Sequence, residues 1–176
     1  MPERSFELTH RARLIVIGIM TVAILAVINS QIVQKEAIIR DGTTILLGLA
    51  PVDPRSLIQG DYMALRYAMT DGVARLAETA GLDDGRIIVR LDQDGVAELV
   101  AIDEGQQLGA NQHLLRFRKR GDSVRLASDA YFFEERQLAV YDRARFGELR
   151  VADDGEAVLT GLRDQQRERL GPTAND

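Results

Sequence analysis

The sequence predicts one transmembrane helix followed by a mainly antiparallel β domain, an α+β fold outside the cytoplasm. A long uncharged run near the N-terminus predicts the helix, whereas five Asp-Gly pairs and alternating apolar residues between them predict turns and strands. These signals divide the chain into four parts: a stub at residues 1–13, an anchor at residues 14–33, a β-rich domain at residues 34–163 and a flexible tail at residues 164–176.

The anchor is predicted from residues 14–33, whose first fifteen residues carry no charge and nothing more polar than Thr21. A helix needs about 20 apolar residues to cross the hydrocarbon core of a bilayer. A cleaved secretory signal is one alternative, but its apolar region has only about 7–15 residues, and no A-x-A site closes this run. A buried core helix is another alternative, and the apolar residues on every face argue against it.

The basic residues that flank the anchor predict its orientation. Arg4, Arg11 and Arg13 precede it, whereas Lys35 and Arg40 follow it. Because basic residues favour the cytoplasmic side, the N-terminus is expected inside and the β domain in a periplasm or the extracellular space. The absence of cysteine fits that location and excludes a disulfide scaffold.

The charge of the chain bears on its partners. The formal charge is −5, and because residues 1–13 contribute +1, the remainder carries −6. Such a balance favours solubility and excludes nucleic acid as an expected partner.

Three hairpins are predicted in the β domain. The clearest surrounds Asp94-Gly95, a second turns at residues 118–122, and a third turns at residues 153–156. An earlier strand is expected to place Ile45 and Leu47 on one apolar face.

Two segments interrupt this β pattern. A helix is predicted from Glu134 to Phe146, because Leu138 and Tyr141 share a stripe and Gly147 follows as a C-cap. Residues 71–79 are left as either a short helix or a loop.

Residues 51–67 read PVDPRSLIQGDYMALRY and contain the most distinctive pattern of the domain. Prolines at its start interrupt a strand, and Gly60 is expected to lead into the next one at a positive φ. In that strand Met63, Leu65 and Tyr67 would face the core, and Tyr62 would face the other way.

This segment resembles the motif of the GDYxxLxY protein family, a group of bacterial membrane-anchored proteins. Each required position matches, and they are Gly60, Asp61, Tyr62, Leu65 and Tyr67. The PVDPR and FFEE segments, the chain length and the single N-terminal helix resemble the family as well. The resemblance implies no particular activity, but it implies location in a bacterial inner membrane and companionship with multi-spanning membrane proteins.

The motif residues are expected to have two kinds of role. Gly60, Leu65 and Tyr67 are interpreted as structural. Asp61 and Tyr62, with Arg55 nearby, are the candidate binding residues.

Catalytic chemistry has weak support in the sequence. The signal-peptidase nucleophile box ends in a similar L-x-x-G-D, but Val52 stands where its serine would be. His113 is the only histidine after the anchor, so no histidine zinc site, other metal site or cofactor is predicted. Asp92 and Asp94 begin like a calcium loop whose later ligands are missing.

We therefore expect a non-catalytic accessory or binding module for a polytopic membrane protein, with a single span and a periplasmic domain. The alternative is a carboxylate-dependent hydrolase acting at the membrane surface. The sequence does not distinguish a barrel from a sandwich.

Overall fold

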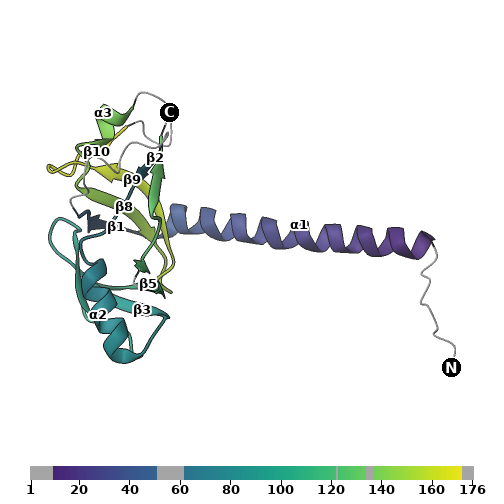
Figure 1. The fold of residues 1–176 in the computed structure, drawn as a ribbon, viewed down its shortest axis with the longest axis horizontal. Coiled ribbons are helices and arrows are strands. Elements are labelled where there is room, and N and C mark those ends of the chain that lie inside the picture. The colour runs from purple at the N-terminus through teal and green to yellow at the C-terminus, as the bar shows by residue number, and fades with distance from the viewer. Residues whose placement is uncertain (1–9, 51–61, 122, 134–136, 172–176) are drawn as a thin grey trace. The chain divides into compact units, whose positions relative to one another are not determined.

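The computed structural model describes residues 10–50, 62–121, 123–133 and 137–171. Residues from Ile38 onward form one compact unit, and the residues before Ile38 form another. Figure 1 shows a long helix and a domain built mostly of strands. The predicted fold class, an apolar N-terminal helix followed by a mainly antiparallel β domain, is confirmed.

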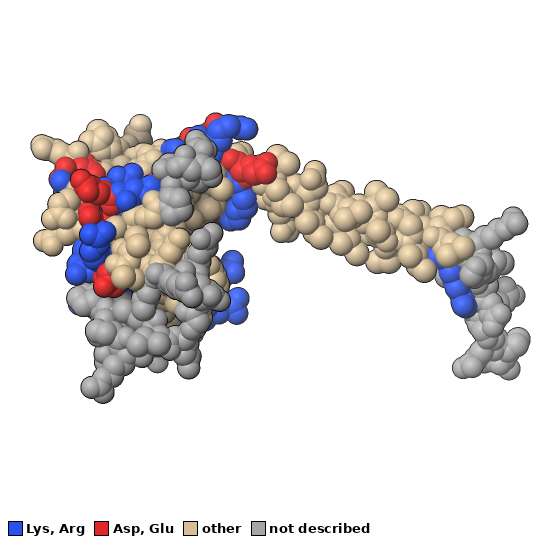
Figure 2. All heavy atoms as spheres, turned by 90° about the horizontal axis from the view of Figure 1, so that it is seen from above, with Lys and Arg blue, Asp and Glu red and all other residues tan. Residues whose placement is uncertain are grey.

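Helix α1 spans His10–Asp41 and extends beyond the predicted anchor at both ends. Its 32 residues correspond to about 48 Å, against about 30 Å for a hydrocarbon core. The segment Ala12–Asp41 is long and apolar enough to span a membrane, and most of the apolar side chains along it are exposed, although Ile38 is buried. Figure 2 shows a continuous uncharged surface along most of this helix. The core helix of a soluble protein would instead be mostly buried.

The described part of the β domain contains two four-stranded sheets and one two-stranded sheet, all formed by antiparallel pairs. The first sheet has the order β1-β8-β9-β10, with strands Thr43–Gly48, Phe146–Val151, Ala157–Arg163 and Arg169–Leu170. The second has the order β4-β3-β5-β6, with strands Ala97–Ile102, Asp84–Leu91, Gln112–Arg120 and Ser123–Arg125. The third pairs β2, Tyr62–Ala64, with β7, Ala130–Phe132.

The hairpins β3–β4 and β8–β9 have the same register. Adding 60 to both numbers of a pair in the first hairpin gives a pair in the second, as in Leu91–Ala97 and Val151–Ala157. Both registers shift at the same place, which leaves Val100 and Thr160 as the extra residues. The domain therefore contains a structural repeat that no repeat in the sequence had indicated.

The two sheets are joined through the turns of these hairpins. The carbonyl of Gly95, in the β3–β4 turn, accepts a hydrogen bond of 2.9 Å from Leu46 N–H in β1. The carbonyl of Gly155, in the β8–β9 turn, accepts one of 2.8 Å from Arg116 N–H in β5. Each turn thus bonds to the strand that pairs with the first strand of the other hairpin, β1 beside β8 and β5 beside β3.

The main apolar core contains side chains of both four-stranded sheets. Ile45 and Leu47 are fully buried, which confirms the predicted face of the first strand, and Ile87 and Leu115 contribute from the other sheet. A smaller cluster contains Met63, Tyr141, Ala144, Leu162 and Leu170. Figure 1 shows β2, α3 and β10 at one end of the domain and α2 at the other.

The helices differ from the predicted ones. Helix α2, Thr70–Ala80, resolves the choice left open for residues 71–79, and Gly81 caps it in the left-handed conformation. In place of the helix predicted from Glu134 to Phe146, the described residues contain helix α3 at Leu138–Tyr141, and Phe146 already begins β8, whereas residues 134–136 lie outside the described residues. Gly147 is therefore a strand residue and no C-cap, because pairing of residues 146–151 with β1 and β9 outweighs the local helical pattern.

The predicted tail is also partly ordered. Leu162 and Arg163 pair with Leu170 and Arg169 across the β9–β10 turn. Leu170 is buried, so apolar burial holds a segment whose polar composition had suggested an end without structure.

Candidate functional site

The motif is divided between described residues and residues outside them. Gly60, Asp61 and Arg55 lie outside the described residues, so their predicted roles remain predictions. Tyr62, Leu65 and Tyr67 are described, and the strand alternation puts them on different sides.

Tyr62 lies at the surface, as the alternation predicted, and contacts a second aromatic residue. It pairs with Phe132 across the β2–β7 ladder, with ring centroids 5.7 Å apart. Phe132 is 74% exposed and Tyr62 is 38% exposed. Ala64 and Ala130 are the next pair on this face. We call these four uncharged residues the aromatic face.

Tyr67 is buried and connects separate segments. Its hydroxyl donates a hydrogen bond of 3.0 Å to the carbonyl of Ser128, which lies just before β7. A Cβ on Gly147 would lie 3.1 Å from the Tyr67 ring, so glycine provides room for it. Burial, and secondarily the negative charge of Asp129, raises the pKa of the Tyr67 hydroxyl above its ordinary value.

Backbone hydrogen bonds fix the rest of the motif strand. Leu65 N–H donates to Asp129 at 2.7 Å, and Ala68 N–H donates to Gly48 at 2.8 Å. Leu65 also packs against the smaller apolar cluster, which contains its neighbour Met63. The strand therefore joins β1 to the segment around β7, and this geometry favours the structural interpretation of Leu65 and Tyr67.

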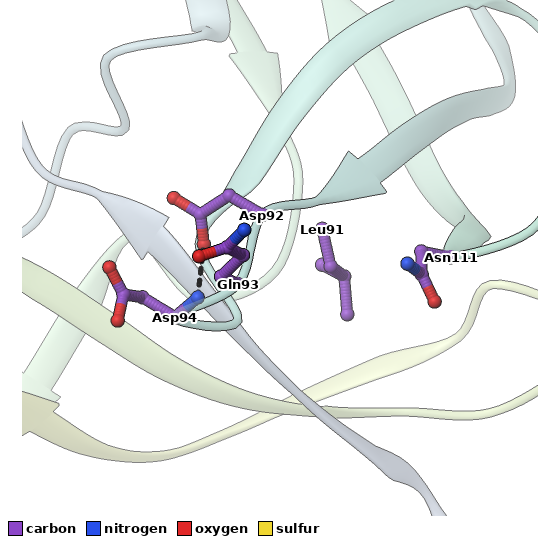
Figure 3. Close-up of a pocket in the computed structure, with 5 residues that line it drawn as sticks. All are labelled: Leu91, Asp92, Gln93, Asp94 and Asn111. Carbon is purple, nitrogen blue, oxygen red and sulfur yellow. Dashed lines mark hydrogen bonds between the residues drawn. The ribbon is translucent and has the colours of Figure 1, made fainter.

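A surface hollow of about 480 Å³ lies beside the β3–β4 turn, lined by Leu91, Asp92, Gln93, Asp94 and Asn111. Figure 3 shows the Asp92 carboxylate accepting a hydrogen bond from the backbone of Asp94. Asp92 also accepts one from Val96 N–H, whereas Asp94 forms an ion pair with Arg167. These carboxylates thus stabilise the turn and the neighbouring segment.

Metal binding and histidine catalysis each require particular arrangements of side chains. Among the described residues no group of three His, Cys, Asp or Glu side chains is arranged to hold a metal ion. His113 is a half-buried residue of β5, opposite Val89 of β3.

Sequence patterns did not predict a charged cluster on β8, β9 and β10 that is centred on a buried glutamate. Glu148 is 5% exposed, and its carboxylate lies 2.5 Å from Arg163 Nε and 3.6 Å from Arg169 Nη1. Thr160 donates a hydrogen bond of 3.2 Å to the carbonyl of Glu148. The one signal in the sequence was the position of Glu148 in an otherwise largely apolar strand. The residues near it in sequence did not indicate which side chains would pair with it.

The comparisons with known proteins give one match. A family model described as GDYXXLXY protein matches residues 24–162, which include the motif and strands β1 to β8. Searches among curated proteins and among solved structures found no match.

Proposed function

The chain belongs to the GDYXXLXY protein family, and we propose that its β domain is a non-catalytic accessory or binding module for a polytopic membrane protein. In this proposal α1 is the single anchor in a bacterial inner membrane. The N-terminus lies in the cytoplasm and the β domain lies in the periplasm. The length and apolar surface of α1 and the arginines before it support this arrangement.

The aromatic face carries the proposal. Tyr62 is a motif residue, yet it points away from the core that Met63 and Tyr67 enter. Large exposed aromatic residues are enriched where proteins bind one another, because they bury much area at little entropic cost. A partner in the same membrane would meet this face at a high effective concentration.

The surface of the sheet that contains β3 and β5 differs from the aromatic face. On that sheet, exposed arginines form ion pairs with exposed carboxylates, as Arg90 does with Glu98 and Arg118 with Asp84. Such pairs keep a surface hydrated and contribute little energy each. The aromatic face has no charged residue among its four members. Burying it against a partner therefore costs less desolvation free energy than burying a charged surface of the same size.

Site-specific photocrosslinking tests the proposal. A photoreactive phenylalanine analogue replaces Phe132 in the full chain, expressed in the membranes of its own host. We expect a crosslink to a protein with several transmembrane segments, and Tyr62→Ala should reduce its yield severalfold while leaving α1 in the membrane.

Val100 provides the matched control position, because it is an apolar residue of β4 with 40% exposure outside the aromatic face. The analogue at Val100 should give no such crosslink. A crosslink of equal yield from both positions, or none from Phe132, would contradict the proposal.

A further inference from the structure

The last described segment folds back on the domain although its strand is very short. Strand β10 has two residues, Arg169 and Leu170, and pairs with the end of β9. Its turn is held by Asp164, whose carboxylate accepts hydrogen bonds from the N–H groups of Gln166 and Glu168. A ladder this short gives few hydrogen bonds, so side chains must hold the segment in place.

Charged side chains supply the first set of these contacts. Arg169 donates a hydrogen bond of 2.7 Å to the carbonyl of Thr160 and lies beside the buried Glu148 carboxylate. Arg163 bonds to the same carboxylate and donates at 2.8 Å to the carbonyl of Arg167 in the turn. One buried carboxylate thus joins both ends of the turn to β8.

Apolar and aromatic contacts supply the second set. Leu170 is 4% exposed and belongs to the same cluster as Met63 and Tyr141. A Cβ on Gly171 would lie 2.0 Å from the Tyr141 hydroxyl oxygen, so the backbone of the segment passes close to the hydroxyl end of that side chain. The end of the segment therefore packs against Tyr141.

Tyr141 in turn supports the strand pair that carries the motif. Its ring centroid lies 5.2 Å from that of Tyr131 and 5.0 Å from that of Phe133. Tyr131 is the β7 residue opposite Met63 of β2, and both lie on the reverse side of the aromatic face. The contacts run without interruption from β10 through Tyr141 to β7 and β2.

We propose that residues 163–171 form a clasp that holds the contacting rings of Tyr131, Phe133 and Tyr141 beneath the motif strand and so sets the conformation of the aromatic face. Opening the clasp removes the support of Tyr141 and loosens the two-stranded β2–β7 sheet, which has only three residue pairs of its own. The buried residues of the main core between the two larger sheets form a separate cluster from those that the clasp contacts.

Amide hydrogen exchange of the full chain in detergent micelles tests the clasp. Arg169→Ala removes the contacts to Thr160 and Glu148 while leaving the pair of Arg163 with Glu148. Leu170→Ala removes apolar contact instead. In both variants we expect amides of β2 and β7 to exchange at least about tenfold faster, because each variant removes contacts that hold the segment against Tyr141 and local opening then becomes more frequent. Exchange in β3 and β5 should change less than about twofold.

Arg90→Ala is the matched control, since it removes an exposed ion pair with Glu98 on the other sheet. It should leave exchange in β2 and β7 unchanged. Faster exchange confined to residues 163–171 would overturn the proposal, because the motif strand would then be independent of the clasp. Equal acceleration throughout the domain would overturn it too, because the segment would then be part of the global core.

Discussion

Single residues of the motif have opposite surroundings although they are neighbours in sequence. Tyr62 faces solvent beside Phe132, whereas Tyr67 is 4% exposed and bonds to Ser128. The hydroxyl of Tyr67 joins residues that are 61 positions apart. Its aromatic ring and its hydroxyl therefore have separable roles, which a deletion of the hydroxyl alone can measure.

Tyr67→Phe should lower the free energy of unfolding by about 1 kcal/mol, because a buried carbonyl loses its donor while the ring still fills its site. The variant should keep the native near-ultraviolet circular dichroism of its remaining tyrosines. Denaturation of the full chain in detergent measures the loss. No loss of stability would mean that the bond to Ser128 contributes nothing.

The raised pKa of Tyr67 also predicts that the stability of the domain depends on pH in the alkaline range. The folded state raises the pKa of Tyr67, so its contribution to stability is present below the unfolded value of about 10 and is lost as pH rises above it. The difference in free energy of unfolding between the wild type and Tyr67→Phe should therefore shrink above about pH 10. Denaturation of both proteins at pH 8 and above pH 10 checks this. A constant difference in stability would contradict it.

Gly42 lies between the last turn of α1 and β1, where the backbone is crowded. A Cβ there would lie 2.5 Å from the carbonyl oxygen of Ile38 and 3.0 Å from that of Val151. Gly42→Ala should therefore cost about 1–3 kcal/mol of stability. Gly48, at the other end of β1, has nothing within 4 Å of such a Cβ, and Gly48→Ala should stay within about 0.5 kcal/mol. Thermal unfolding compares the two, and equal losses would contradict the crowding argument.

At the scale of elements, the two matching hairpins differ in how their turns meet the rest of the domain. Gly95 has φ 77° and open space around it, whereas Gly155 has φ 87° and lies against the backbone of Leu114 and Arg116. The two hairpins thus have the same register, but only the turn of the second one is tightly packed against a neighbouring strand.

This difference predicts unequal effects of the same substitution. Gly95→Ala should cost about 1–2 kcal/mol, the strain of a left-handed conformation. Gly155→Ala should cost at least about 1 kcal/mol more, because its methyl group also meets backbone atoms that cannot move independently. Thermal unfolding followed by circular dichroism measures both. Losses of the same size would show that the β8–β9 turn can shift away from β5.

At the scale of the whole molecule, the proposed topology predicts the location of each end of the chain. Alkaline phosphatase fused to the C-terminus should be active, because it folds only after export, and a fluorescent reporter that matures only in the cytosol should be dark there. The reverse pattern would refute the periplasmic location. The same reporters fused before residue 10 provide the control and should give the opposite signals.

The sequence by itself determined the features that depend on local composition. An uncharged run fixes an apolar helix, because every residue in it has the same preference for an apolar environment. Alternation around Asp94-Gly95 and Asp154-Gly155 fixes two hairpins, and the spacing of the motif fixes family membership and the outward position of Tyr62. Each of these needs only residues near one another in the chain.

Local patterns gave the wrong result where distant strands compete for the same residues. Asp84-Gly85 has the composition of a turn but lies inside β3, where pairing with β5 supplies the hydrogen bonds. A helix is predicted from Glu134 to Phe146, but the observed helix α3 ends at Tyr141. The reason is that Phe146 begins β8, which pairs with β1 on one side and β9 on the other.

Only the tertiary structure decided which distant groups meet. Glu148 lies beside Arg163 and Arg169, the Tyr67 hydroxyl bonds to Ser128, and the two hairpins share one register although they are 60 residues apart. The physical reason is that backbone pairing and burial constrain geometry and polarity but leave side-chain identity largely free. Partners across a sheet or a core are therefore selected by the folded arrangement, which no short window of sequence contains.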